Sequence, residues 1–180
     1  MFLRRIVYRL ASYPRKFFLY IKNIWLNTIC SSPIVPIGVR RLLLHLCGHN
    51  VSKVFSNCFF GEGPGHLYIG KGSFVNHGCF FDLGGDITIG DNCAIAMNVS
   101  FINGTHEILH NDTKIWGGQF CEPIVVKNGC WLCANSVILP GVTIGEGTII
   151  AAGSVVINNC EPFCLYAGVP AKKIKELKNN

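Results

Sequence analysis

Hydrophobic residues recur at every sixth position through the second half of the chain. The recurring aliphatic residues are Val126, Leu132, Ile138, Ile144, Ile150 and Val156. Two positions before each of the last five stands a small residue, in order Cys130, Ser136, Val142, Thr148 and Ser154. An α-helix repeats its buried face every 3.6 residues and a strand every two, so neither element alone explains the spacing. A solenoid of short strands and turns does explain it, because each strand with its turn occupies one repeat.

The same six-residue spacing appears upstream, in two runs of three residues. The last residue of the first run and the first residue of the second are eight positions apart instead of six. The residues of the two runs are Ile69, Val75, Phe81, Ile89, Ile95 and Phe101. Glycine directly follows three of the repeated residues, at Gly70, Gly90 and Gly145. We expect these glycines to adopt positive φ at tight corners, while the large apolar side chains fill the interior. The pattern predicts an all-β solenoid domain over residues 51–180.

The beginning of the chain differs from the rest in charge. Residues 1–61 contain nine Lys or Arg and no Asp or Glu, whereas the remaining residues contain seven basic and ten acidic side chains. The net charge is therefore 9 + 7 − 10 = +6. Apolar residues in the basic part recur at helical spacing, first on Leu3, Ile6, Val7 and Leu10 and then on Phe17, Phe18, Ile21, Trp25 and Ile29. We interpret residues 1–50 as a basic, aromatic helical segment.

Such a segment suits two roles. One is peripheral contact of residues 1–30 with an anionic membrane, and the other is a cap over the open end of the solenoid. Pro14, Arg15 and Lys16 interrupt any apolar core of a secretory signal, and the longest uncharged stretch, residues 23–39, is shorter than the roughly 20 residues of a membrane span. No nucleic-acid-binding motif accompanies the cations. We expect a cytoplasmic protein, peripheral on the inner face of the membrane.

Ten cysteines are present, and their positions argue against disulfides and zinc. Cys79, Cys93 and Cys130 occupy the small position of the repeat, where cysteine acts as a compact apolar residue. Cys130 and Cys133 form a single C-x-x-C without a second pair at zinc-site spacing. We expect free thiols in a reducing compartment and no metal.

The six-residue spacing is lost after Phe101. Residues 106–123 follow no regular register and include His106, His110 and Trp116. Loops on a rigid scaffold are where functional side chains concentrate. We therefore expect an ejected loop at about residues 106–123 that carries the functional site.

Four stretches resemble the hexapeptide-repeat acyltransferases, in the branch of maltose, galactoside and polysaccharide O-acetyltransferases. They are residues 89–93 (IGDNC), Thr105-His106 at the start of the loop, residues 131–134 (WLCA), and residues 151–154 (AAGS) followed by 167–172 (AGVPAK). The last string is the most specific. The resemblance implies a left-handed parallel β-helix and a homotrimer with active sites between neighbouring subunits. We expect the chain to end in a short C-terminal helix.

The resemblance also assigns roles. His106 stands where the family has its general base, and a neutral imidazole can take the proton of a sugar hydroxyl that attacks a thioester. Asn76 falls where relatives place a donor to the oxyanion, although an asparagine that satisfies backbone groups at a corner explains it nearly as well. Asp82 and Trp116 are candidates for binding the acceptor.

Acetyl-CoA is the implied co-substrate. Small residues at Ala134 and Ala152 would leave room for its pantetheine arm, beside Trp131 of the same motif. Lys172 and Lys175 fall where relatives place cations for the nucleotide phosphates. Because no cysteine lies beside His106 within the loop, we expect direct transfer in a ternary complex rather than through an acyl-cysteine.

The favoured interpretation is an O-acetyltransferase that moves an acetyl group from acetyl-CoA to a sugar hydroxyl. A lipid-linked saccharide in surface polysaccharide biosynthesis (capsule, O-antigen or exopolysaccharide) is the expected acceptor, and an amine acceptor stays open. Two other classes also stay open. One is a zinc-dependent hydratase resembling γ-class carbonic anhydrases, with His77, His106 and His110 as ligands. The other is a non-catalytic scaffold of an envelope assembly.

Overall fold

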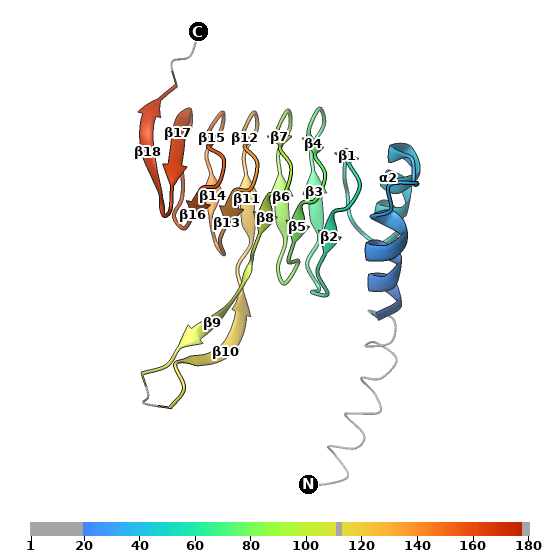
Figure 1. Ribbon diagram of the computed structural model, residues 1–180, viewed down its shortest axis with the longest axis horizontal. Helices are drawn as coiled ribbons and strands as arrows, with labels where there is room; N and C mark the ends of the chain where they lie inside the picture. Colours follow the sequence, from blue (N-terminus) through green and yellow to red (C-terminus); the bar gives the residue numbers. More distant parts are fainter. Residues whose placement is uncertain (1–19, 111–112, 178–180) are drawn as a thin grey trace.

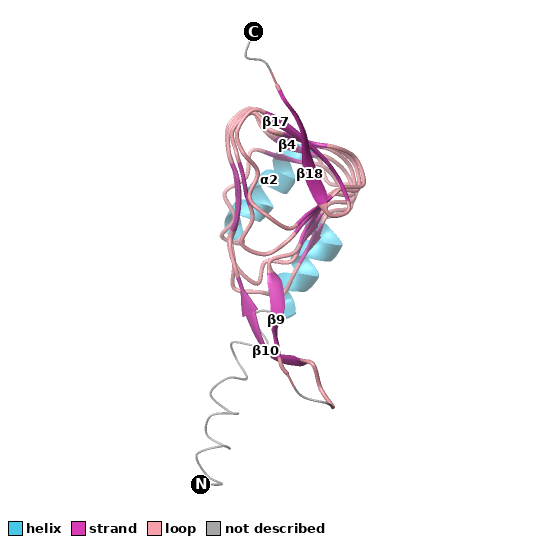
Figure 2. Cartoon of the chain, turned by 90° about the vertical axis from the view of Figure 1, so that its left-hand side faces the viewer, coloured by secondary structure: helices cyan, strands magenta, loops and turns pink. Residues whose placement is uncertain are grey.

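The computed structural model describes residues 20–110 and 113–177. This part of the chain forms a parallel β-solenoid of triangular cross-section, with two helices at one end and a long hairpin projecting from one side (Figure 1 and Figure 2). The predicted helical face of Leu3, Ile6, Val7 and Leu10 lies outside the described residues. No helix in the described ranges has the length and apolar character needed to cross a bilayer.

Short strands stack into three sheets, one on each side of the triangle. Sheet 1 contains β3 (Leu67–Ile69), β6 (Ile87–Ile89), β11 (Ile124–Val126) and β14 (Thr143–Ile144). Sheet 2 contains β1 (Lys53–Val54), β4 (Phe74–Val75), β7 (Ala94–Ile95), β12 (Trp131–Leu132), β15 (Ile149–Ile150), β17 (Cys164–Gly168) and β18 (Ala171–Glu176). Sheet 3 contains β2 (Phe59–Phe60), β5 (Phe80–Phe81), β8 (Ser100–Phe101), β13 (Val137–Ile138) and β16 (Val155–Val156).

The predicted apolar repeat forms the core. All twelve repeated residues are 5% exposed or less, and the small residues paired with them are buried as well. Equivalent residues of successive coils align, so that Val126 pairs with both Ile89 and Ile144. Each fully buried side chain of this size contributes about 1.5–3 kcal/mol relative to exposure. All ten cysteines are free thiols.

The prediction for the glycines after the repeated residues was wrong about backbone conformation. Gly70, Gly90 and Gly145 do not have positive φ. They are required because stacked corners approach closely: a Cβ on Gly145 would lie 2.5 Å from the backbone nitrogen of Pro162. Positive φ occurs two residues later in the same turns, at Gly72, Asn92 and Gly147.

Two helices cover the end of the solenoid at β1. They are the π-helix η1 (Trp25–Cys30) and the α-helix α2 (Ile37–Leu46), which pack Leu26 and Leu44 into the core. Arg40 of α2 is only 2% exposed. Its guanidinium donates hydrogen bonds to four backbone carbonyls, those of Cys30, Ser32, Val35 and Val54. This buried cation therefore joins both helices to the first coil.

The expected C-terminal helix is wrong. Residues 171–176 instead form β18, which runs antiparallel to β17. The chain reverses after Gly168, which has a φ of 104°. In this position β18 supplies hydrogen-bond partners to the otherwise open edge of the last coil, and a helix would leave that edge unpaired.

Candidate functional site

The interruption of the repeat is an antiparallel hairpin rather than an irregular loop. Strand β9 (Gly104–Ile108) pairs with β10 (Trp116–Cys121), with a bulge between Trp116 and Gln119. Val126 pairs with Ile144, an offset of 144 − 126 = 18 residues, whereas Ile89 pairs with Val126, an offset of 126 − 89 = 37. The coil that carries the hairpin is therefore longer by 37 − 18 = 19 residues. Figure 1 shows the hairpin extending away from the solenoid between β8 and β11.

Two neighbouring residues of β10 contact the imidazole of His106. Its Nδ1 lies 3.2 Å from the carbonyl oxygen of Gly117 on the opposite strand. Because a carbonyl only accepts hydrogen bonds, Nδ1 is the donor in this contact, and in the neutral imidazole the lone pair is then on Nε2. The ring of Trp116 packs edge-on against the imidazole, with 5.4 Å between centroids, and the Nζ atom of Lys114 lies 3.8 Å from the centroid of the Trp116 ring.

Asp82 lies at the root of the hairpin. Its Oδ2 accepts a hydrogen bond of 2.7 Å from the backbone N–H of Gly104, two residues before His106. A hydrogen bond to a charged group contributes about 1.5–3 kcal/mol, so this carboxylate anchors the strand that presents the histidine. Asp82 and Trp116, the predicted acceptor-binding residues, thus both lie with His106 in the hairpin region.

Asn76 lies on a different edge of the solenoid, between sheets 2 and 3. It directly follows β4, and its backbone N–H bonds to the next coil. The residues that directly follow the sheet-2 strands of later coils stack in one column with it, namely Ala96, Cys133 and Ala151. The Oδ1 of Asn76 accepts from the backbone N–H of His77 at 2.8 Å, which orients the amide and leaves its NH₂ group as the donor.

The predicted donor-binding residues extend along the same edge and the adjoining face. Ala134 and Ala152 directly follow Cys133 and Ala151, which belong to the column of Asn76. The N–H of Gly153 donates a hydrogen bond to the Ala134 carbonyl. Trp131 is half exposed on the outer face of β12. Across sheet 2, Trp131 is in register with Ile149, Ile149 with Leu165, and Leu165 with Lys175 on β18.

The lysines of β18 differ in their surroundings. Lys173 forms ion pairs with Glu161 and Glu176, at 2.8 and 3.0 Å. Those contacts hold its pKa above the usual value for lysine. Lys172 and Lys175 are exposed on β18, in register with Ala167 and Leu165 of β17.

The structure therefore separates the predicted residues into two groups. The hairpin group contains His106, Trp116 and Asp82. The edge group contains Asn76 together with the predicted donor-binding residues Trp131, Ala134, Ala152, Lys172 and Lys175. In Figure 2, which looks along the solenoid, the hairpin leaves from one corner of the triangle. The chain reaches that corner as it leaves sheet 3. The edge group lies along a different corner, where the chain passes from sheet 2 to sheet 3, and on the adjoining face of sheet 2.

Two residues that contact this site, Gly117 and Lys114, were not predicted from the sequence. Gly117 meets His106 only because β9 and β10 pair across the hairpin, a partnership that an unassigned loop does not reveal. The run Trp116-Gly117-Gly118 was the available signal, since glycines within a strand often mark a bulge or a close contact.

The three histidines considered for a zinc site do not form one within the described chain. The Nδ1 of His77 lies 2.9 Å from the Oγ of Ser56, on the side of the solenoid near β1. Across residues 20–110 and 113–177, no group of three or more His, Cys, Asp or Glu side chains is arranged to hold a metal ion.

Comparison with known proteins agrees with this architecture. The family described as bacterial transferase hexapeptide (six repeats) matches residues 123–158. A Saccharomyces cerevisiae protein, named as a candidate acetyltransferase, is 32% identical over 139 residues, which are 77% of this chain and 69% of that protein. Galactoside O-acetyltransferase of Escherichia coli is 34% identical over 121 residues, 67% of this chain and 59% of the enzyme.

A solved structure extends the comparison to the fold. The hexapeptide-repeat acetyltransferase of Vibrio cholerae, in complex with acetyl coenzyme A, superposes with a TM-score of 0.71 at 28% identity and covers 89% of this chain and 86% of its own. The repeating parallel coil defines a hexapeptide-repeat solenoid. This chain belongs to the hexapeptide-repeat acetyltransferase family. It spans little more than half the length of several matched relatives, 55% to 59%.

Proposed function

We propose that this protein is an O-acetyltransferase that moves the acetyl group of acetyl-CoA to a hydroxyl of a saccharide. The observation that carries the proposal is the state of His106. Its Nδ1 donates to the Gly117 carbonyl, so that in the neutral imidazole Nε2, on an exposed hairpin, is the nitrogen available as a base. The names of the related proteins support the reaction class, since they include a galactoside O-acetyltransferase and an acetyltransferase in complex with acetyl coenzyme A.

The proposed reaction is a direct transfer. Nε2 of His106 takes the hydroxyl proton as the oxygen attacks the thioester carbonyl carbon, and the NH₂ group of Asn76 donates to the oxyanion that forms. Collapse of this intermediate breaks the carbon–sulfur bond, and the imidazolium returns the proton to the CoA sulfur. Cys133 stacks in the column of Asn76, but burial raises the pKa of its thiol, which makes an acyl-cysteine route unfavourable.

The edge group supplies the proposed donor site. The pantetheine arm would lie along the edge that carries Ala134 and Ala152, where small side chains leave the backbone accessible. Trp131 offers a flat apolar surface beside it. Lys172 and Lys175 would meet the phosphates of the nucleotide, as point charges on a strand that is exposed to solvent.

We further propose a homotrimer in which the hairpin of one subunit reaches the edge group of its neighbour. The two groups occupy different corners of one chain, so a neighbouring copy provides the simplest way to combine them. The hairpin also presents large apolar side chains to solvent in the single chain, on Ile108, Ile115 and Trp116. Such residues are suited to burial between subunits.

The proposed acceptor is a saccharide of a surface polysaccharide under assembly, presented on a lipid carrier at the inner face of the cytoplasmic membrane. The excess of cations in residues 1–61 supports this location, because that face is anionic. The acceptor of the Escherichia coli relative, by its name, is a galactoside, which supports a sugar hydroxyl as the acceptor group.

Release of the CoA thiol from acetyl-CoA, measured against a panel of sugars and lipid-linked glycans, tests the proposal. His106→Asn should lower the rate by about 10²–10⁴-fold and leave acetyl-CoA affinity unchanged, because only the base is lost. His110→Asn, from the same hairpin, is the matched control and should retain the rate. Failure of the wild-type protein to bind acetyl-CoA would overturn the proposal, as would full activity of His106→Asn. Stoichiometric zinc in a protein that does not bind acetyl-CoA would favour a hydratase.

Mixed assemblies test whether the site lies between subunits. His106→Asn and Asn76→Ala should each be inactive alone, yet their co-assembled mixture should recover about one quarter of the wild-type rate, because random pairing creates intact sites at that frequency. No recovery in mixtures shown by mass spectrometry to contain both variants would place both residues in one subunit's site.

A further inference from the structure

The two helices at the start of the described chain present an apolar face that the solenoid does not use. Their inner side packs Leu26, Cys30 and Leu44 into the core. The outer side of these helices, with the helical residues 20–24 that lead into η1, exposes large hydrophobic side chains, which together we name the cap face: Ile21, Ile24, Trp25, Val39, Leu42 and Leu46. Leu46 is 76% exposed. Residues this apolar are rarely left in water as a group without a function.

The cap face is continuous between the helices. Val39, Leu42 and Leu46 share one side of α2, at helical spacings of three, four and seven residues. An apolar pocket of about 270 Å³ joins that side to η1 and is lined by Trp25, Cys30, Leu43, Leu46 and Cys47. Trp25 and Leu46 therefore belong both to the cap face and to the pocket between the helices.

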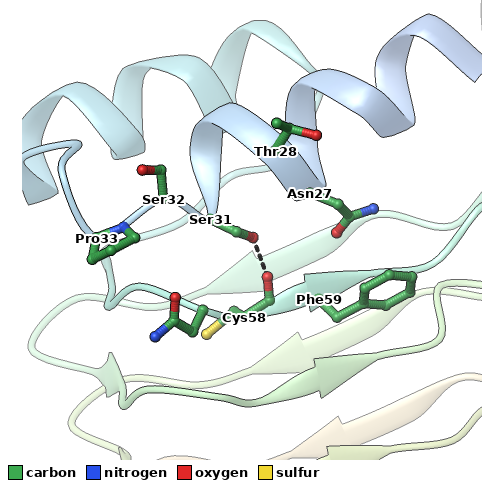
Figure 3. Close-up of a pocket in the computed structure, with 8 residues that line it drawn as sticks. Asn27, Thr28, Ser31, Ser32, Pro33, Cys58 and Phe59 are labelled. Atoms are coloured by element: carbon green, nitrogen blue, oxygen red, sulfur yellow. Dashed lines mark hydrogen bonds between the residues drawn. The ribbon is translucent and has the colours of Figure 1, made fainter.

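Hydrogen bonds fix the direction in which the cap face points. Asn27 of η1 donates to the Phe60 carbonyl and accepts from its N–H, both at 2.8 Å. Ser31 donates to the carbonyl of Cys58, as drawn in Figure 3. Asn27, Ser31 and Cys58 line a cleft of about 420 Å³ between η1 and β2. Together with the four carbonyls bound by Arg40, they hold the helices rigidly on the solenoid.

Charge identifies the occupant of the cap face. Arg41 flanks the apolar side of α2 and is exposed, Lys22 precedes η1, and the first acidic residue of the chain is Glu62. An apolar stripe bordered by cations, on helices that carry no carboxylate, is the pattern of helices that lie in an anionic lipid interface. A nucleic acid would leave the aliphatic centre of this face without partners.

We propose that the cap face docks the protein end-on to an anionic lipid bilayer, with η1 and α2 at the level of the headgroups and the pocket between them open to acyl chains. The solenoid would then stand away from the surface, carrying the hairpin at a set height. This docking involves none of the residues assigned to acetyl transfer, so its success or failure is independent of the reaction.

Co-sedimentation with vesicles tests the docking. The full chain should bind vesicles of phosphatidylcholine with about 30% phosphatidylglycerol at least tenfold more tightly than phosphatidylcholine alone, and salt should weaken the binding. Leu42→Gln with Leu46→Gln should reduce the partition coefficient at least tenfold, since two apolar anchors are lost. Val169→Gln with Ile174→Gln, at the opposite end of the solenoid, is the matched control and should bind as wild type.

Two readouts keep the test decisive. Both double variants change exposed residues, so thermal unfolding should confirm that they are folded. Brominated lipids should quench part of the tryptophan emission of the wild type, and Trp25→Phe should lose that quenching. Absence of binding to the anionic vesicles would overturn the proposal. Undiminished binding of the Leu42/Leu46 variant would overturn it too, by assigning the contact to the basic residues before η1. Binding to RNA without binding to vesicles would also overturn the proposal.

Discussion

The solenoid and its hairpin place similar side chains in opposite environments. In the solenoid, Phe81 and Phe101 are fully buried and stack with 5.2 Å between centroids. In the hairpin, Trp116 and Phe120 are exposed, and Trp116 contacts His106 and Lys114 instead of a core. The repeat thus supplies stability through many equivalent contacts. Chemistry requires a residue outside the repeat, because a group that must meet a substrate cannot be stacked between coils.

The largest difference between the two regions should appear on truncating a phenylalanine in each. Phe101→Ala should lower the free energy of unfolding by about 3–5 kcal/mol, because it removes a buried ring and leaves a cavity in the stacked core. Phe120→Ala in the hairpin is the matched control, with an expected loss of less than about 0.5 kcal/mol. Urea unfolding measures both. Equal losses would show that the hairpin belongs to the cooperative core, through contacts between subunits.

A second difference concerns two histidines. His49 is 1% exposed in the solenoid, where its Nδ1 accepts from the N–H of Leu67 and its Nε2 has no partner among the described residues. Burial, with smaller contributions from Lys22 and His66, lowers the pKa of His49 from 6.5 to about 4. Between pH 4 and 6.5, the His49 side chain is therefore protonated in the unfolded chain and neutral in the folded chain.

Stability should consequently fall as the pH is lowered from about 6.5 to 4, by about 3 kcal/mol from His49 alone. In His49→Asn, whose side-chain oxygen can still accept from Leu67, this part of the pH dependence should disappear. His106→Asn should keep it, because His106 is exposed on the hairpin. Denaturant unfolding at several pH values measures the slopes. Parallel curves for wild type and His49→Asn would refute the assignment.

The smallest expected difference involves a glycine in each region. Gly145→Ala should destabilise the protein by about 1–3 kcal/mol, since its Cβ would meet the backbone of Pro162 at 2.5 Å. Gly118→Ala in the hairpin should change stability by less than about 0.5 kcal/mol, because the nearest atom, on the flexible side chain of Glu107, lies at 3.5 Å. Thermal unfolding of the two variants provides the comparison. A neutral Gly145→Ala would mean that the stacked corners can separate.

The same contrast explains what could be predicted from the sequence. The core followed from the six-residue spacing because each position repeats the environment of the one six residues before it. The hairpin was predicted only as an interruption, since its pairing depends on contacts such as that of His106 with Gly117. The strand β18 was mistaken for a helix because the decisive factor, the open edge of β17, is tertiary. Burial of Arg40 was equally hidden, because a cation in a basic segment gives no sign of four carbonyl partners.

The two ends of the solenoid are finished by different means, helices over β1 and a reversed strand over β17. Parallel coils of this kind could otherwise accept another molecule's coil by main-chain pairing, at either end and without limit. The helices cover the first coil, and β18 covers the edge of β17 in sheet 2, which removes part of the template for fibre growth. These covers disfavour end-to-end stacking of coils, so contacts between copies side by side, which can close on themselves, are favoured.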